Sequence, residues 1–132
     1  MIIAKSESWK EFHKEAEDYS KAAFSAFEKG KFTHDTLYNI ICMSIEKYLV
    51  AFSIFHGQMP MNHTLSGLIE EIKVKFPVTD ELKKGIFFID TFQDICIITS
   101  AQRKEPNNLE MKRMIDIMVD VKAWVNAKIV TE

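Results

Sequence analysis

The chain has 132 residues, a formal net charge of −2 at pH 7 and 47% hydrophobic residues. This length corresponds to one domain, residues 1–132, and the composition excludes a disordered or collagen-like chain. The near-neutral charge provides no field that would attract DNA or an anionic membrane, so we expect neither as a partner. Only 4 Gly and 3 Pro interrupt the sequence, which favours long helices.

The cysteines and the N-terminus indicate a reduced, cytoplasmic protein. Cys42 and Cys96 lie in apolar runs, and two thiols cannot form a disulfide framework. The N-terminal apolar stretch is shorter than the roughly 7–15 residues of a signal peptide. Residues 48–69 lack Asp, Glu, Lys and Arg, but Gly57 and Pro60 interrupt them, which indicates a helix end and a loop rather than a membrane span.

Hydrophobic periodicity predicts two long helices in the first half of the chain. The first begins at Ser8, which forms the S-x-x-E spacing of a capping box with Glu11, and it ends at Gly30. The second follows Thr33 as its cap and continues to about Phe55, where a loop over residues 57–64 begins.

The second half predicts three further helices. A short helix starts at Leu65 and stops before Pro77. Thr79 caps a helix that is apolar nearly all round up to about residue 100, so this helix is either central or half of an interface. A polar connection over residues 101–108 leads to the last helix, which begins at Leu109 and ends at about Ile129.

These elements describe an all-α fold. Four long helices and one short helix, with no predicted strand, are typical of an antiparallel up-and-down helical bundle. Di-iron bundles use Glu-x-x-His motifs, and no histidine here follows a glutamate by three residues. We therefore predict neither a metal site nor a cofactor.

A few polar residues interrupt the apolar segments. Asp90 and Asp94 lie one turn apart and could act as an acid and base pair or bind a cation, although pairing with lysines or with capping groups is the commoner role. His63 precedes the short helix, so it could bind an anion together with the helix N-terminus, or simply close the loop. Arg103 and Lys104 follow the apolar helix, where positive charge also stabilises the helix end.

One run of the second helix points to a known family. Residues 44–51, SIEKYLVA, are followed by Gly57, by His63-Thr-Leu and later by Arg103 to Pro106. In this order the elements resemble the HEPN domain family (higher eukaryotes and prokaryotes nucleotide-binding) over nearly the whole chain. The resemblance implies a helical bundle, usually a symmetric homodimer, with a polar cleft that contacts a nucleotide or RNA. Many members are encoded beside a small nucleotidyltransferase, and others are RNA-cleaving toxins.

The resemblance also indicates site residues. Ribonuclease members carry an arginine followed four to six residues later by a histidine, but no histidine follows His63 here. By the resemblance, Glu46 and Lys47 match the pair on the family's second helix, His63 matches its loop histidine and Arg103 its last connection. We expect these four residues to form the binding site, with Lys47, His63 and Arg103 lining a shared anion-accepting surface.

The leading hypothesis is a non-catalytic, dimeric binding module for a nucleotide, an RNA or a partner nucleotidyltransferase. The alternative is a metal-independent ribonuclease of the toxin type with a nonstandard site, such as His63 with Arg103 or Asp90 with Asp94. A purely structural oligomerisation domain is the third reading that the sequence permits.

Overall fold

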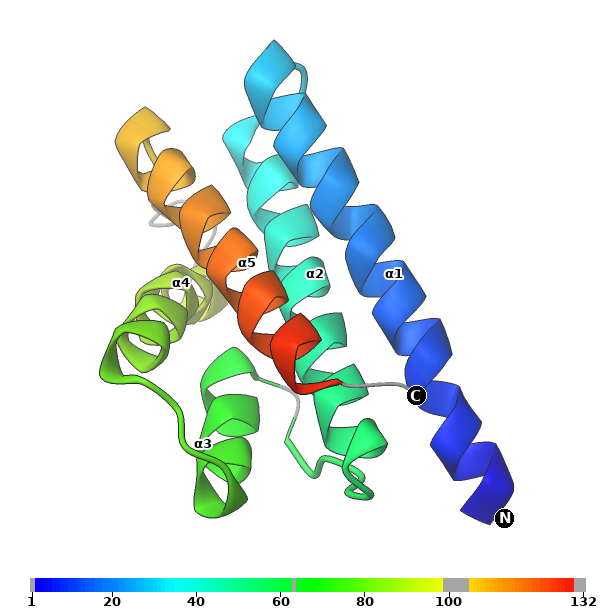
Figure 1. The fold of residues 1–132 in the computed structure, drawn as a ribbon. Helices are drawn as coiled ribbons and strands as arrows, with labels where there is room; N and C mark the ends of the chain where they lie inside the picture. Colours follow the sequence, from blue (N-terminus) through cyan, green and yellow to red (C-terminus); the bar gives the residue numbers. More distant parts are fainter. Residues whose placement is uncertain (1, 63, 99–104, 130–132) are drawn as a thin grey trace.

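The computed structural model describes residues 2–62, 64–98 and 105–129, which form five α-helices and no strand. The helices are α1 (Ile2–Lys29), α2 (His34–Phe55), α3 (Leu65–Lys75), α4 (Asp80–Ile98) and α5 (Asn108–Lys128). The all-helical class predicted from the sequence is confirmed, and the helices assemble into a bundle (Figure 1).

Side chains that accept backbone hydrogen bonds define four of the helix starts. The predicted caps Thr33 and Thr79 both accept a bond from the backbone N–H three residues ahead, and Thr64 does the same for α3. Asn107 and Glu110 form a reciprocal capping box at the start of α5. Each cap satisfies an N–H group that has no partner within its helix.

The start of α1 differs from the prediction. The helix begins at Ile2, so the predicted start at Ser8 is wrong. Residues 2–7 contain neither Gly nor Pro, and the helix therefore continues through the S-x-x-E spacing instead of being capped there. The predicted end is confirmed, because Gly30 has a φ of 64° and terminates α1 in the left-handed region.

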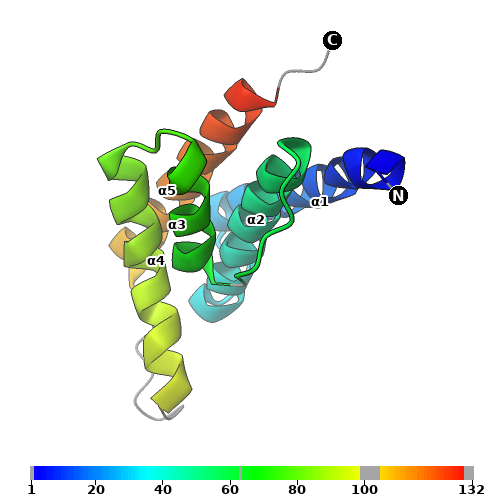
Figure 2. The ribbon, with the colours of Figure 1, turned by 90° about the horizontal axis from the view of Figure 1, so that it is seen from below.

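The helices surround α2, which contacts α1, α3 and α5. In Figure 1, α1 runs opposite to α2, whereas α5 lies on the other flank of α2 and runs in the same sense. Two contacts fix that parallel pair: the His34 ring nitrogen Nδ1 lies 2.7 Å from the Pro106 carbonyl at the helix starts, and Trp124 packs on Phe52 further along. Figure 2 shows α3 alongside α4, with α1 lying across the direction of this pair.

The core forms around the inner faces of α2 and α5. Small residues let α1 approach α2 closely, and the buried hydroxyl of Ser44 donates a hydrogen bond to the backbone carbonyl of Ala16 at 3.0 Å. The largest fully buried side chains of the two inner faces include Leu37, Ile41, Ile45, Tyr48, Leu49, Phe52, Met111 and Met114. Among the described helices, α2 is long and apolar enough to cross a membrane, but 61% of its apolar window is buried inside the fold, as expected of a core helix.

Much of the apolar surface of α4 is buried within the fold. The residues of its inner face are Leu82, Gly85, Ile86, Ile89 and Phe92, all of them buried. On the outer side, the Arg113 guanidinium covers the Phe88 ring at 4.0 Å from its centroid, while Phe87 stays exposed. Packing against α3 and α5 therefore accounts for most of the apolar character of residues 80–92.

Candidate functional site

Of the four predicted site residues, Glu46 and Lys47 lie in the described part of the chain. The Lys47 ammonium is 2.9 Å from a carboxylate oxygen of Glu15 and lies 5.1 Å from the centroid of the Phe12 ring. Lys47 therefore ties α2 to α1. Glu46 is half-buried, and because adjacent helical residues do not face each other, the two side chains point to different sides of α2.

His63 and Arg103 lie outside the described residues, as do Lys104 and the side chain of Asp94. The structure therefore describes only Lys47 of the three residues expected to line one surface. The surface formed by Lys47, His63 and Arg103 remains a prediction.

The N-terminus of α3, considered above as an anion site, already has protein acceptors. The Asp90 carboxylate accepts a hydrogen bond from the backbone N–H of Ser66 at 2.8 Å, and the Thr64 hydroxyl accepts one from Gly67 at 3.0 Å. Asp90 thus has the capping role that was the commoner expectation for it. Its negative charge occupies the position that a bound anion would take at this helix end.

A polar cluster that sequence reasoning did not identify joins three helices. Glu17 on α1 accepts hydrogen bonds from the Tyr48 hydroxyl on α2, at 2.8 Å, and from the Asn126 amide on α5, at 3.2 Å. The Lys122 ammonium lies 3.5 Å from its other carboxylate oxygen. His13 lies one turn before Glu17, with its Nε2 at 3.6 Å from the carboxylate and 2.6 Å from the Asn126 side-chain oxygen. We refer to these five residues as the Glu17 cluster.

The surroundings of Glu17 favour its ionised form. Burial alone would raise its pKa, but the hydrogen bonds from Tyr48 and Asn126 and the nearby Lys122 and His13 outweigh burial and lower it. For Tyr48, burial and the bond to Glu17 both raise the pKa, so the phenol stays protonated as a donor. The cluster therefore holds a carboxylate that is charged and already supplied with donors, which makes it a poor general base near neutral pH.

An apolar groove opens beside the Glu17 cluster, between α1 and α5. It encloses about 410 Å³. Its lining consists of Ser20, Lys21, Phe24, Val119, Lys122, Ala123 and Asn126. Lys122 and Asn126 belong to both features, so the polar cluster borders the groove. We call this feature the α1–α5 groove.

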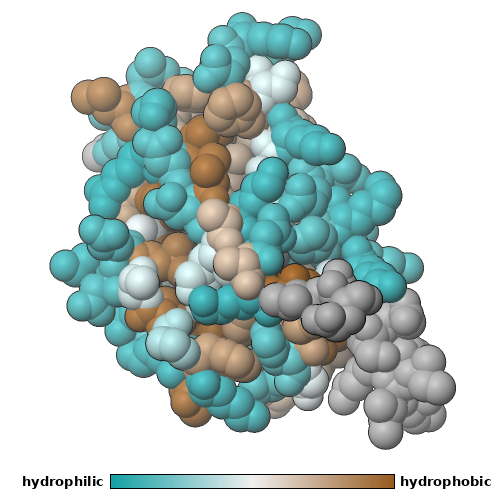
Figure 3. Space-filling view, in the orientation of Figure 1, coloured by the Kyte–Doolittle hydropathy of each residue, from teal (hydrophilic) through white to brown (hydrophobic). Residues whose placement is uncertain are grey.

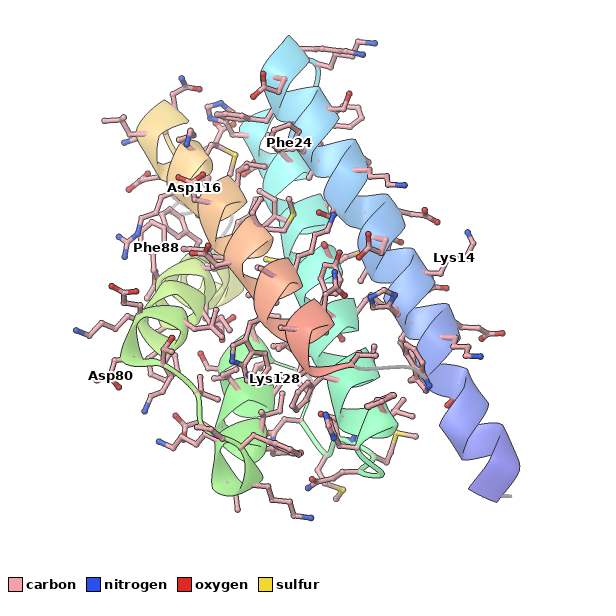
Figure 4. All side chains as sticks on the ribbon, viewed as in Figure 1. Lys14, Phe24, Asp80, Phe88, Asp116 and Lys128 are labelled. Atoms are coloured by element: carbon pink, nitrogen blue, oxygen red, sulfur yellow. The ribbon has the colours of Figure 1, made fainter. Side chains whose placement is uncertain are left out.

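The floor of the groove is hydrophobic and accessible. Phe24 is 48% exposed and Val119 is 42% exposed, although both are large apolar side chains. Figure 3 shows a hydrophobic strip between hydrophilic surfaces on this face, and Figure 4 shows Phe24 on the side of α1 that faces α5. Apolar surface of this kind beside a few polar groups is typical of a binding site.

No group of three or more His, Cys, Asp or Glu side chains in the described part of the chain could hold a metal ion.

The sequence contains one signal of the Glu17 cluster, since His13 and Glu17 lie four residues apart on one helix face. It contains no comparable signal of the groove, because Phe24 and Val119 belong to helices distant in the sequence.

Comparison with known proteins gives one structural likeness. No family model matches the sequence, and no curated protein matches it. The fold is similar to the crystal structure of TT1696 from Thermus thermophilus, with a TM-score of 0.74 and 16% identity, over 91% of this chain and 97% of that one. At this identity the likeness concerns the fold alone.

Proposed function

We propose that the protein is a non-catalytic binding module of the HEPN type that docks a partner on the α1–α5 groove. The observation that carries this proposal is the exposure of Phe24 and Val119 in a groove of about 410 Å³. A monomeric protein gains nothing in stability from leaving such side chains in water, whereas a docked partner would bury them.

The chemistry of the adjoining polar groups supports binding rather than catalysis. Glu17 is saturated with donors, and Asp90 caps α3. Of the two alternative ribonuclease sites, Asp90 with Asp94 would need the Asp90 carboxylate that caps α3, and His63 with Arg103 lies outside the described residues. No observation in the described residues favours that second reading.

The family resemblance adds three parts to the proposal: an antiparallel up-and-down bundle, a homodimer, and a nucleotide, RNA or nucleotidyltransferase partner. The antiparallel pair of α1 and α2 supports the bundle topology, although α5 runs parallel to α2. The exposed Phe87 on α4 supports a second association face away from the groove. Glu46, Lys47, His63 and Arg103 stay the proposed contacts for a nucleotide, an RNA or that partner.

The first test is the solution mass of the purified protein, followed by thermal unfolding with and without millimolar ATP or GTP. A dimer whose midpoint rises with one nucleotide would support the nucleotide-binding form, because a ligand selective for the folded state stabilises it. A dimer without a shift would favour a protein partner. Turnover of total RNA that disappears in a Glu17→Gln or Asp90→Asn variant would overturn the non-catalytic assignment.

A further inference from the structure

We propose that the α1–α5 groove binds an amphipathic helix of a protein partner that carries acidic residues beside its apolar face. This inference rests on the proposed binding function and specifies the chemistry of the occupant. Its basis is the combination of an apolar floor, two helical walls and the lysine Lys21 at the rim.

The shape of the groove fits a helix. Both walls are helices that pack on α2 and contact each other only weakly, so they leave a seam open to solvent along the molecule. Val119 and Asn126 span two turns of α5, about 10 Å of helix. A helix laid in the seam would place apolar side chains one turn apart over Phe24, Val119 and Ala123, as in other helix-in-groove complexes.

The charges at the rim favour an acidic occupant. Lys21 on α1 and Lys122 on α5 place one cation on each wall, but the Lys122 ammonium already lies 3.5 Å from the Glu17 carboxylate, so Lys21 is the cation that an occupant would meet. Within the part of the chain that the structure describes, Lys21 has no acidic partner. Two acidic residues nearby on the same helices have lysine partners: Asp18 pairs with Lys14 at 3.1 Å, and Asp116 pairs with Lys112 at 3.0 Å. A third, Asp120, lines a different hollow together with Thr79 and Trp124.

The same charges disfavour a second copy of this chain as the occupant. Two copies that met groove to groove about a two-fold axis would bring Lys21 and Lys122 of both copies to one interface. Like charges at an interface oppose association, whereas a carboxylate beside the apolar face of a partner helix would complement Lys21. The homodimer contact of the proposed function would therefore use another face.

The test measures binding of fluorescent probe helices to the full chain by anisotropy. The acidic probe is a stapled helix of about 15 residues with leucines along one face and glutamates on both flanks. A second probe has lysine in place of every glutamate, and a third is a scrambled form of the acidic probe. We expect the acidic probe to bind at least about tenfold more tightly than either of the others.

Matched variants locate the binding. Lys21→Glu should weaken the acidic probe about fivefold, whereas Lys84→Glu, the same charge change at an exposed site of α4, should leave it unchanged. Phe24→Ala should weaken it about tenfold. Phe32→Ala is the control, since Phe32 is 45% exposed and outside the groove. All four sites are exposed in the folded chain, so the variants should fold, and circular dichroism checks that they do.

Two outcomes would overturn the inference: equal or tighter binding of the lysine probe, or equal effects of the groove variants and their controls. If no probe binds but a nucleotide raises the unfolding midpoint, the inference fails and the proposed function stands. If no probe binds, and the wild type cleaves total RNA whereas the Glu17→Gln or Asp90→Asn variant does not, both the inference and the proposed function fail. If the wild type is a dimer and Lys21→Glu changes its solution mass, the groove binds a second copy of the chain instead.

Discussion

The hydroxyl of Tyr48 donates a hydrogen bond to the carboxylate of Glu17 across 2.8 Å, and this bond links the central helix to α1 beside the apolar groove. The ring of Tyr48 is fully buried, so its hydroxyl requires a partner inside the fold. Glu17 supplies that partner and in turn holds Asn126 and Lys122 of α5. One carboxylate thus connects α2 to the two helices that line the groove.

Removal of the Tyr48 hydroxyl should weaken this connection. We expect Tyr48→Phe to lower the free energy of unfolding by about 1–2 kcal/mol, because Glu17 loses a donor while the ring still fills its site. Urea denaturation measures the change. Tyr19→Phe is the matched control, since Tyr19 is half-buried on α1 and makes no hydrogen bond in the described structure. Equal losses in the two variants would contradict the role of the bond.

The ionisation of Glu17 predicts a specific dependence of stability on pH. Its pKa in the folded chain is lower than the ordinary value of 4.5, so below that value the unfolded chain binds the proton first. The stabilisation by Glu17 is therefore complete above about pH 4.5 and is lost as the pH falls through the lower, folded pKa.

Glu17→Gln isolates this contribution. Gln cannot ionise, so the difference in unfolding free energy between wild type and variant should shrink as the pH is lowered from 7 toward 3. Denaturant unfolding at several pH values measures it. A difference that stays constant over this range would show that the charge of Glu17 does not contribute.

The sequence predicted the helices well because their signals are local. Thr33 and Thr79 act through backbone groups three residues away, and Gly30 acts through its own φ. The wrong start of α1 has a local cause too, since a capping sequence at Ser8 does not stop a helix that is free to continue on its N-terminal side. The parallel pairing of α2 and α5 depends on contacts between distant residues, such as Phe52 with Trp124, which no local pattern predicts.

The candidate site was less predictable for the same reason. Glu17, Tyr48 and Asn126 come from three helices, and only packing brings them together. Tyr48 belongs to the apolar second helix and its ring is buried, but the sequence pattern does not indicate which group receives its hydroxyl. Phe24 followed no periodic pattern of the core, and its exposure beside Val119 became visible only when α1 and α5 were placed together.

The contact between Asp90 and Ser66 predicts a stability effect on α3. Asp90→Ala leaves the Ser66 N–H without its acceptor and removes a negative charge from the helix N-terminus, which should cost about 1–2 kcal/mol. Asp90→Asn keeps an acceptor oxygen and should cost less. Hydrogen exchange should show faster exchange of the Ser66 amide in the alanine variant. Asp120→Ala, at an exposed position of α5, is the control, and an equal loss there would contradict the capping role.

His56 predicts a second effect of pH at the far end of α2. Its ring packs against Phe52 and Phe76, with centroids 4.5 and 4.6 Å away, while the residue stays partly exposed to solvent. The desolvation of the ring lowers its pKa below the ordinary 6.5, although a hydrogen bond with the backbone of Lys128 opposes the shift. The folded state therefore prefers neutral His56, and the stabilisation is complete above about pH 6.5 and lost as the pH falls through the folded pKa.

An NMR titration should give His56 a pKa below 6.5. The unfolding free energy of His56→Gln should also fall less than that of the wild type between pH 7.5 and 5. A normal or raised pKa for His56 would contradict the packing argument, because protonation would then not oppose the contact of the ring with Phe52 and Phe76.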